Sequence, residues 1–208
     1  MNKHNLFVAI LFCCICASAG AQTLEVAALK SFSPSVIREV FDIARYVKLD
    51  GDTQVALACA FEKEDAAFVE AVEADGGILS VKSARKLEKM RDRDLAAILS
   101  DEELKQYYRG VYDAEALAEG NAVGDKLRKK YNLSDQNWKF IRIAFYKIGL
   151  ESRVINKLSD NPAEAKKKIA AIRKEQLATI EAKGGIRVND DMTVTVVRPF
   201  DPNALHKE

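Results

Sequence analysis

The densest run of large apolar residues after the N-terminus extends from Asn132 to Ile155 and contains the only tryptophan of the chain. At helical spacing, one stripe holds Trp138, Ile141, Phe145, Ile148 and Ile155, and Phe140, Ile143, Ala144 and Val154 widen it. A helix with so wide an apolar surface packs against several neighbours. We therefore expect this helix at the centre of a helical bundle.

Apolar residues at the same spacing predict five further helices. They begin near residues 34, 53, 83, 101 and 162, and they end near residues 49, 76, 99, 130 and 184. Ser33–Pro34 and Asn161–Pro162 are typical helix starts, and Ser100 with Glu103 forms a capping box. Glycine weakens a helix interior by roughly 1 kcal/mol relative to alanine. At Gly120 we therefore expect a kink, a break or a close contact with another helix.

Near the C-terminus the spacing changes to period two. Ile186 and Val188, then Met192, Val194 and Val196, alternate across an Asn-Asp-Asp turn, which predicts a β-hairpin over residues 186–198. Because two strands alone are marginally stable in water, we expect a third strand, for which residues 23–29 are the nearest candidate. The predicted fold is mainly α: a bundle of about six helices with this small C-terminal hairpin. We expect a single domain over residues 22–200 and a disordered tail over 201–208.

Two successive helices match two later helices at nearly the same offset. A shift of 84 residues or of 82 residues aligns, among others, Phe61 with Phe145 and Arg91 with Arg173. These offsets favour two duplicated three-helix halves, about 34–99 and 101–182, whose second helices face each other. A competing match between two Gly-Gly-Ile segments uses a different offset, so the sequence leaves the duplication open.

Residues 1–21 have the pattern of a secretory signal peptide: a short positive start, the apolar run LFVAILFCCICA and small residues before a cleavage site. Cleavage after Ala21 leaves Gln22 first, and cleavage after Ala19 is the alternative. The apolar run is shorter than the roughly 20 residues of a membrane span, and large residues stand where a lipoprotein signal needs small ones. We expect an exported protein, periplasmic or extracellular, of a bacterial cell envelope, with no stable membrane span after cleavage.

Composition narrows the class of partner. Hydrophobic residues make up 48% of the chain and charged residues 30%, as in ordinary globular proteins. Without residues 1–21, which contain Lys3, the 32 basic residues become 31 and balance the 31 acidic ones. A neutral chain has no global field that gathers nucleic acid. Cys59 is then the only cysteine, so no internal disulfide forms, and its apolar neighbours predict a small buried residue.

The sequence offers few residues for catalysis. His206, in the predicted tail, is the only histidine after residue 21, so Ser-His-Asp and Cys-His catalysis lack a base and imidazole-based metal sites lack ligands. There is no dinucleotide-binding or phosphate-binding motif. We predict no cofactor and no metal. The many carboxylates leave a two-carboxylate hydrolase open.

A group of aromatic residues is the candidate binding site. On the predicted helices 101–130 and 132–155 it comprises Tyr107, Tyr108, Tyr112, Trp138, Arg142 and Tyr146. Arg142 can stack on Tyr146, one turn later. Aromatic side chains with an arginine suit a groove for a sugar, a peptide or another small ligand. The alternative is that the tyrosines lie at the rim of the core with their hydroxyl groups in water.

Three helix openings read Leu-Ser-Asp, at 99–101, 133–135 and 158–160. They resemble the Leu-Thr-x-x-Gln openings of Spy/CpxP-like periplasmic helical chaperones over these few residues, and no activity is transferred from that family. We predict a non-enzymatic binding or structural protein of the cell envelope, whose partner is a protein or a small ligand. A holdase-like chaperone and a carboxylate-dependent hydrolase are the alternatives.

Overall fold

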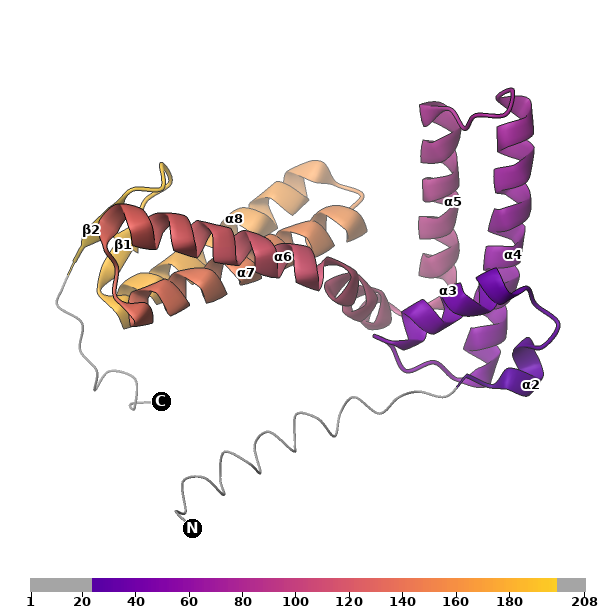
Figure 1. The fold of residues 1–208 in the computed structure, drawn as a ribbon, viewed down its shortest axis with the longest axis horizontal. Helices are drawn as coiled ribbons and strands as arrows, with labels where there is room; N and C mark the ends of the chain where they lie inside the picture. Colours follow the sequence, from indigo (N-terminus) through magenta and orange to yellow (C-terminus); the bar gives the residue numbers. More distant parts are fainter. Residues whose placement is uncertain (1–23, 198–208) are drawn as a thin grey trace, which may run out of the picture. The chain divides into compact units, whose positions relative to one another are not determined.

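The computed structural model describes residues 24–197, so the predicted signal peptide and the predicted tail lie outside the described residues. The elements in this part of the chain (Figure 1) are α2 (Val26–Leu29), α3 (Pro34–Ala44), α4 (Gly51–Ala74), α5 (Val81–Ile98), α6 (Asp101–Tyr131), α7 (Asp135–Leu158), α8 (Pro162–Gly184), β1 (Ile186–Val188) and β2 (Val194–Val196). The prediction of a mainly α fold with a small C-terminal hairpin is confirmed. Between residues 24 and 197, none of the helices has both the length and the apolar character needed to cross a membrane.

The chain divides into two compact units, residues 1–104 and residues 105–208. The boundary falls in the first turn of α6, so unit 1 contains α2 to α5, and unit 2 contains most of α6 together with α7, α8 and the hairpin. The sequence predicts a single domain, and it predicts that the second helices of the two duplicated halves face each other. Both predictions concern how the two units are placed relative to each other. Both stay predictions.

Local sequence decides where the helices begin and end. A side-chain oxygen accepts a hydrogen bond from a first-turn backbone N–H at Ser33, Asp50, Ser80, Ser134 and Asn161. The predicted capping box is present, because the Ser100 N–H donates to the Glu103 carboxylate at 2.8 Å and the Glu103 N–H donates to the Ser100 hydroxyl at 3.4 Å. Gly185 ends α8 with φ of 66°, a left-handed conformation that favours glycine.

In unit 1, α4 and α5 form an antiparallel hairpin, and α3 packs against the part of α4 that lies far from the loop joining the two helices (Figure 1). The core there includes Leu29, Val36, Val40, Ile43, Leu57, Phe61 and Leu95. Gln54 is also buried, but both ends of its amide are satisfied. Its Oε1 accepts from the Glu25 N–H at 2.8 Å and its Nε2 donates to the Leu49 carbonyl at 3.3 Å, which ties the residue before α2 to α4.

In unit 2, α7 is the central helix, as predicted. Eight of its residues are buried, and it packs along α8. The antiparallel hairpin pairs Arg187 with Thr195, and the inward side chains of β1, Ile186 and Val188, join a core cluster with Phe145 of α7. This packing replaces the third strand that the sequence predicted.

Two predictions are wrong. Residues 26–29 form the short helix α2, so they do not supply a third strand, and the sheet of the described residues has two strands. Cys59 is exposed. It lies about 200° around α4 from the buried Phe61, at about 100° per residue, so its apolar neighbours in sequence face the core while Cys59 faces outward.

Both units contain the same contact between an arginine and a buried phenylalanine. The Arg91 guanidinium of α5 lies 4.7 Å from the centre of the Phe61 ring, and the Arg173 guanidinium of α8 lies 5.8 Å from the centre of the Phe145 ring. The bounds of α4 and α7, each 24 residues long, coincide at a shift of 84 residues. These equivalent contacts favour the duplicated halves. The preceding helices differ, because α3 has 11 residues and α6 has 31.

Candidate functional site

The six residues predicted to bind a ligand lie on α6 and α7, but they do not form one group. The Arg142 guanidinium lies 4.3 Å from the centre of the Trp138 ring, the ring one turn before it, instead of over Tyr146 as expected. The Arg128 guanidinium of α6 also lies over Trp138, at 5.3 Å. Two cations therefore already occupy positions at the indole ring.

Polar side chains of α6 use the hydrogen-bonding groups of this pair. Trp138 Nε1 donates to Asp125 Oδ1 at 2.7 Å, and Arg142 Nε donates to Asn121 Oδ1 at 2.6 Å. Both residues are partly buried. The indole N–H and one guanidinium N–H thus join α6 to α7 and do not point to an open site.

Tyr146 has a partner of its own. Its hydroxyl donates to Asp113 Oδ1 at 2.5 Å, and this hydrogen bond is the main reason that the pKa of Tyr146 rises to about 12. The seam between α6 and α7 continues with ion pairs, namely Arg109 with Glu151, and Arg153 with Glu115 and Glu119. A series of polar contacts therefore joins the two helices over most of the length of α7.

The close approach of α6 and α7 depends on glycine. A Cβ atom at Gly120 would lie 2.7 Å from the Arg142 carbonyl oxygen and 2.8 Å from the Tyr146 backbone nitrogen. A Cβ atom at Gly124 would meet the Arg142 side chain at 2.5 Å. Of the three outcomes expected at Gly120, the close helix contact is the one observed, since α6 runs without a break from Asp101 to Tyr131.

The three tyrosines form a separate group near the start of α6. Tyr107 and Tyr108 have ring centres 5.1 Å apart, and Tyr108 stacks on Tyr112 at 6.1 Å. The Lys157 ammonium of α7 lies 5.8 Å from the centre of the Tyr108 ring. Tyr108 is buried, and the other two rings are partly buried. The three rings thus contribute to packing at this end of α6, and ligand binding by the six residues stays a prediction.

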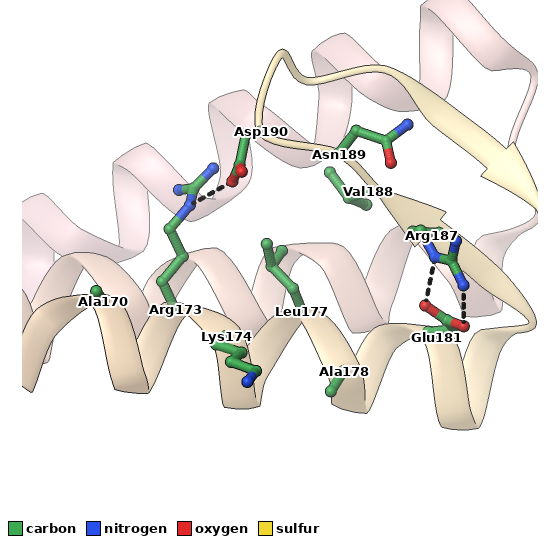
Figure 2. A pocket seen from close by; sticks show the side chains of 10 residues that line it. All are labelled: Ala170, Arg173, Lys174, Leu177, Ala178, Glu181, Arg187, Val188, Asn189 and Asp190. Atoms are coloured by element: carbon green, nitrogen blue, oxygen red, sulfur yellow. Dashed lines mark hydrogen bonds and ion pairs between the residues drawn. The ribbon is translucent and has the colours of Figure 1, made fainter.

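A hollow of about 550 Å³ lies between α8 and the β-hairpin. Figure 2 shows Leu177 and Val188 in its middle, with an ion pair on either side. Arg173 lies 3.6 Å from Asp190 in the hairpin turn, and Arg187 of β1 donates two hydrogen bonds, of 2.7 and 2.8 Å, to Glu181 of α8. These hydrogen bonds raise the pKa of Arg187. The charged groups of this hollow hold the hairpin on α8, so the hollow has the character of a packing seam.

A second hollow, of about 650 Å³, is a groove between α4 and α5. Its apolar lining is Ala67, Ala71, Ala74, Leu87 and Met90, and its polar lining is Glu70, Ser83, Lys86, Lys89 and Arg93. We call this surface the α4–α5 groove. The sequence carries no distinct signal for this surface, because Leu87 and Met90 among lysines and arginines are also the pattern of an ordinary amphipathic helix.

The part of the hairpin that carries this groove has no core. Residues 62–94 include no buried side chain, although the same span contains many large apolar residues. Phe68, Val69, Ile78 and Val81 are 47%, 54%, 82% and 71% exposed. Helices gain most of their stability from packing of an apolar face. The distal hairpin, residues 62–94, therefore leaves four large apolar side chains exposed.

A charge cluster anchors the base of the distal hairpin. Arg91 Nη1 lies 2.6 Å from Glu39 of α3 and 3.1 Å from Glu64 of α4. Burial raises the pKa of Glu64, and Arg91 partly offsets this effect. Burial alone would lower the pKa of Arg91, but the two carboxylates raise it overall. The arginine thus stays charged and joins three helices.

Within residues 24–197, no three side chains of the His, Cys, Asp or Glu type are grouped so that they could hold a metal ion. The α4–α5 groove combines an apolar floor with a charged rim, which suits the binding of another polypeptide, so we take it as the candidate functional site. Comparison of the chain with protein-family models, with curated proteins and with solved structures finds no match.

Proposed function

We propose that the protein is a non-enzymatic binding protein of the bacterial cell envelope and that the distal hairpin is its binding element. The observation that carries this proposal is the absence of any buried side chain in residues 62–94, which nevertheless expose four large apolar residues. Because these four side chains belong to one short segment of the chain, we take that segment as the interaction site. A helical partner laid along the hairpin would bury it.

Unit 2 supports this reading by comparison. There α6 covers α7 up to Arg153, which pairs with Glu115 and Glu119 of α6. A shift of 84 residues places Val69 of α4 at the position of Arg153, and Val69 is 54% exposed. The short α3 covers only the base of α4. The face of α4 that carries Val69 thus has room for a helix; this face lies about 200° around α4 from Ala71 of the groove, at about 100° per residue.

The envelope location rests on the pattern of residues 1–21. Fractionation of the source cells, followed by sequencing of the mature N-terminus, tests it. We expect the protein in the envelope fraction with Gln22 as its first residue. Recovery of the intact N-terminus on a cytosolic protein would refute the location.

Two measurements test the binding element. In hydrogen exchange on the dilute protein, we expect amides of residues 62–94 to exchange much faster than those of residues 141–154 in α7. In cells, a photo-crosslinking residue in place of Ala71 should give a discrete crosslinked product. The same residue in place of the exposed Ala118 of α6 is the matched control and should give none. Slow exchange in the distal hairpin together with no product at Ala71 would refute the proposal.

A holdase-like chaperone is the second candidate, because the same exposed apolar side chains could bind unfolded chains. It predicts that the protein suppresses aggregation of a chemically denatured test protein at substoichiometric or equal concentration. A specific binding protein has no such effect. The hydrolase alternative stays a prediction.

A further inference from the structure

We propose that the partner of the α4–α5 groove is a second copy of this chain, and that two distal hairpins pack side by side as a four-helix bundle. This inference rests on the proposed binding element. Such a bundle is the usual way in which a two-helix unit buries an apolar face on both members at once. The argument has three steps: the charges of the two helices, their register and the symmetry that both require.

The two helices of the hairpin carry opposite charge. α4 has six acidic side chains and one basic one, whereas α5 has six basic and three acidic ones. At the groove itself, α4 contributes Glu70 and α5 contributes Lys86, Lys89 and Arg93. Of the acidic residues of α4, Glu70 lines the groove, so the complementary contact is the one that Glu70 of one copy makes with the cations of α5 in the other copy. An acidic helix opposite an acidic helix would be repelled.

The register places these charges at one height. Glu64 and Arg91 are in contact at 3.1 Å. Glu70 is six residues nearer the α4–α5 loop than Glu64, and Lys86 is five residues nearer than Arg91, so they lie about 9 Å and about 7.5 Å beyond that contact at 1.5 Å per residue. Glu70 and Lys86 therefore stand at nearly the same level on the two sides of the groove.

Only one arrangement of two copies uses this register. A two-fold axis parallel to the helices keeps each residue at the same position along the axis and places α4 of one copy against α5 of the other. Glu70 of each copy then faces Lys86 of the other copy, and neighbouring helices are antiparallel. Between these pairs, the small side chains of Ala67, Ala71 and Ala74 allow close approach, and Leu87 and Met90 fill the centre. An axis perpendicular to the helices would set α4 against α4, which the acidic residues oppose.

The expected affinity is modest. The distal part of α4, residues 62–74, is about 20 Å long at 1.5 Å per residue, so the contact falls at the low end of specific interfaces, below about 1,200 Å² in total. We therefore expect a dimer that forms in the range of tens of micromolar and dissociates on dilution. The contact is isologous and closed, so we expect no species larger than a dimer from it.

Sedimentation equilibrium on the purified protein between about 1 and 500 µM tests the inference. We expect a monomer–dimer equilibrium for the wild type. Glu70→Lys and Lys86→Glu should each weaken the dimer at least tenfold, because each places like charges opposite each other in both contacts. Glu62→Lys makes the same charge change on α4 outside the groove and should leave the equilibrium unchanged. Circular dichroism checks that each variant keeps its helix content.

Mixing the two weakened variants gives the decisive result. Glu70→Lys in one copy and Lys86→Glu in the other restore opposite charges in both contacts, so the mixture should form a heterodimer with near wild-type affinity. A contact within one chain cannot be rescued in this way. A wild type that stays monomeric at 500 µM, or a mixture that fails to associate, overturns the inference.

The crosslinking experiment at Ala71 separates this inference from the proposed function. A product that contains two copies of the chain supports both. A product with a different protein leaves the binding element in place but refutes the second copy as its partner. Absence of any product, with slow exchange in residues 62–94, refutes the binding element itself.

Discussion

Substitution of Gly120 by alanine should destabilise unit 2, although alanine is the better helix former. The added Cβ would lie 2.7 and 2.8 Å from two backbone atoms of α7, whereas ordinary contacts begin at 3.4 Å. Because backbone atoms cannot rotate away, α6 and α7 must separate by about 0.6 Å in a closely packed interface. Over-packing of this kind costs about 1–3 kcal/mol.

The gain in helix propensity, about 1 kcal/mol, offsets part of this cost. The contact involves rigid backbone on both sides, so the upper part of the over-packing range applies, and we expect Gly120→Ala to lower the free energy of unfolding by about 1–2 kcal/mol. Gly124→Ala is the matched control, one turn further along α6. Its Cβ would lie 2.5 Å from Cγ of Arg142, a side-chain atom that can shift more readily than backbone, so we expect a smaller loss than for Gly120→Ala.

Urea unfolding followed by the fluorescence of Trp138 measures both effects. Trp138 is the only tryptophan and lies in unit 2 at this interface, so its signal reports on the unit that is changed. We also expect the native fluorescence of Gly124→Ala to shift, since the displaced Arg142 stacks on the indole ring. If Gly120→Ala is as stable as wild type, or if Gly124→Ala costs more than Gly120→Ala, the close approach does not constrain the two helices.

Four further predictions concern charged and titrating groups. Arg91→Ala should cost about 2 kcal/mol in thermal or chemical unfolding, because it leaves two partly buried carboxylates without their cation. Arg173→Ala should cost about 0.5 kcal/mol, since its partner Asp190 is 95% exposed; equal losses would contradict this reading. A spectrophotometric titration should show a tyrosine that ionises near pH 12, and Tyr146→Phe should remove it. Because the folded-state pKa is raised from 10.0, the stability that this phenol contributes is present below pH 10 and is lost as the pH rises towards 12. The hydrogen bond from Thr53 lowers the pKa of Asp50, so its contribution is present above the ordinary value of 3.8 and is lost as the pH falls below it. Asp50→Asn should flatten that part of an acid-unfolding curve monitored by circular dichroism.

The sequence predicted the helices well because their signals are local. A cap such as Ser33 followed by Pro34, or the box of Ser100 and Glu103, involves atoms within one turn. The apolar stripe of α7 also belongs to a single helix, and its centre is buried as predicted. The nearly equal offsets of Phe61 and Arg91 to their later counterparts were visible in the sequence, but their contact became apparent only in three dimensions.

The candidate sites were predicted less well, because they depend on which helix covers which face. From sequence, Trp138, Arg142 and Tyr146 are aromatic or charged residues on one helix and could equally line a groove or a seam. The structure brings Asp125, Asn121 and Asp113 of α6 against them, which makes this surface a seam. The sequence pattern of each helix is compatible with a groove and with a seam, and the neighbouring helix decides which of the two forms.

The sequence by itself determined the class of fold, the positions of the helices and the C-terminal hairpin. The tertiary structure decided that residues 26–29 are helical, that Cys59 faces outward and that the described elements of unit 1 leave the α4–α5 groove open. The physical reason is the range of the interactions. Periodicity and caps arise between residues a few positions apart, whereas the burial of a face depends on side chains that lie far away in the chain.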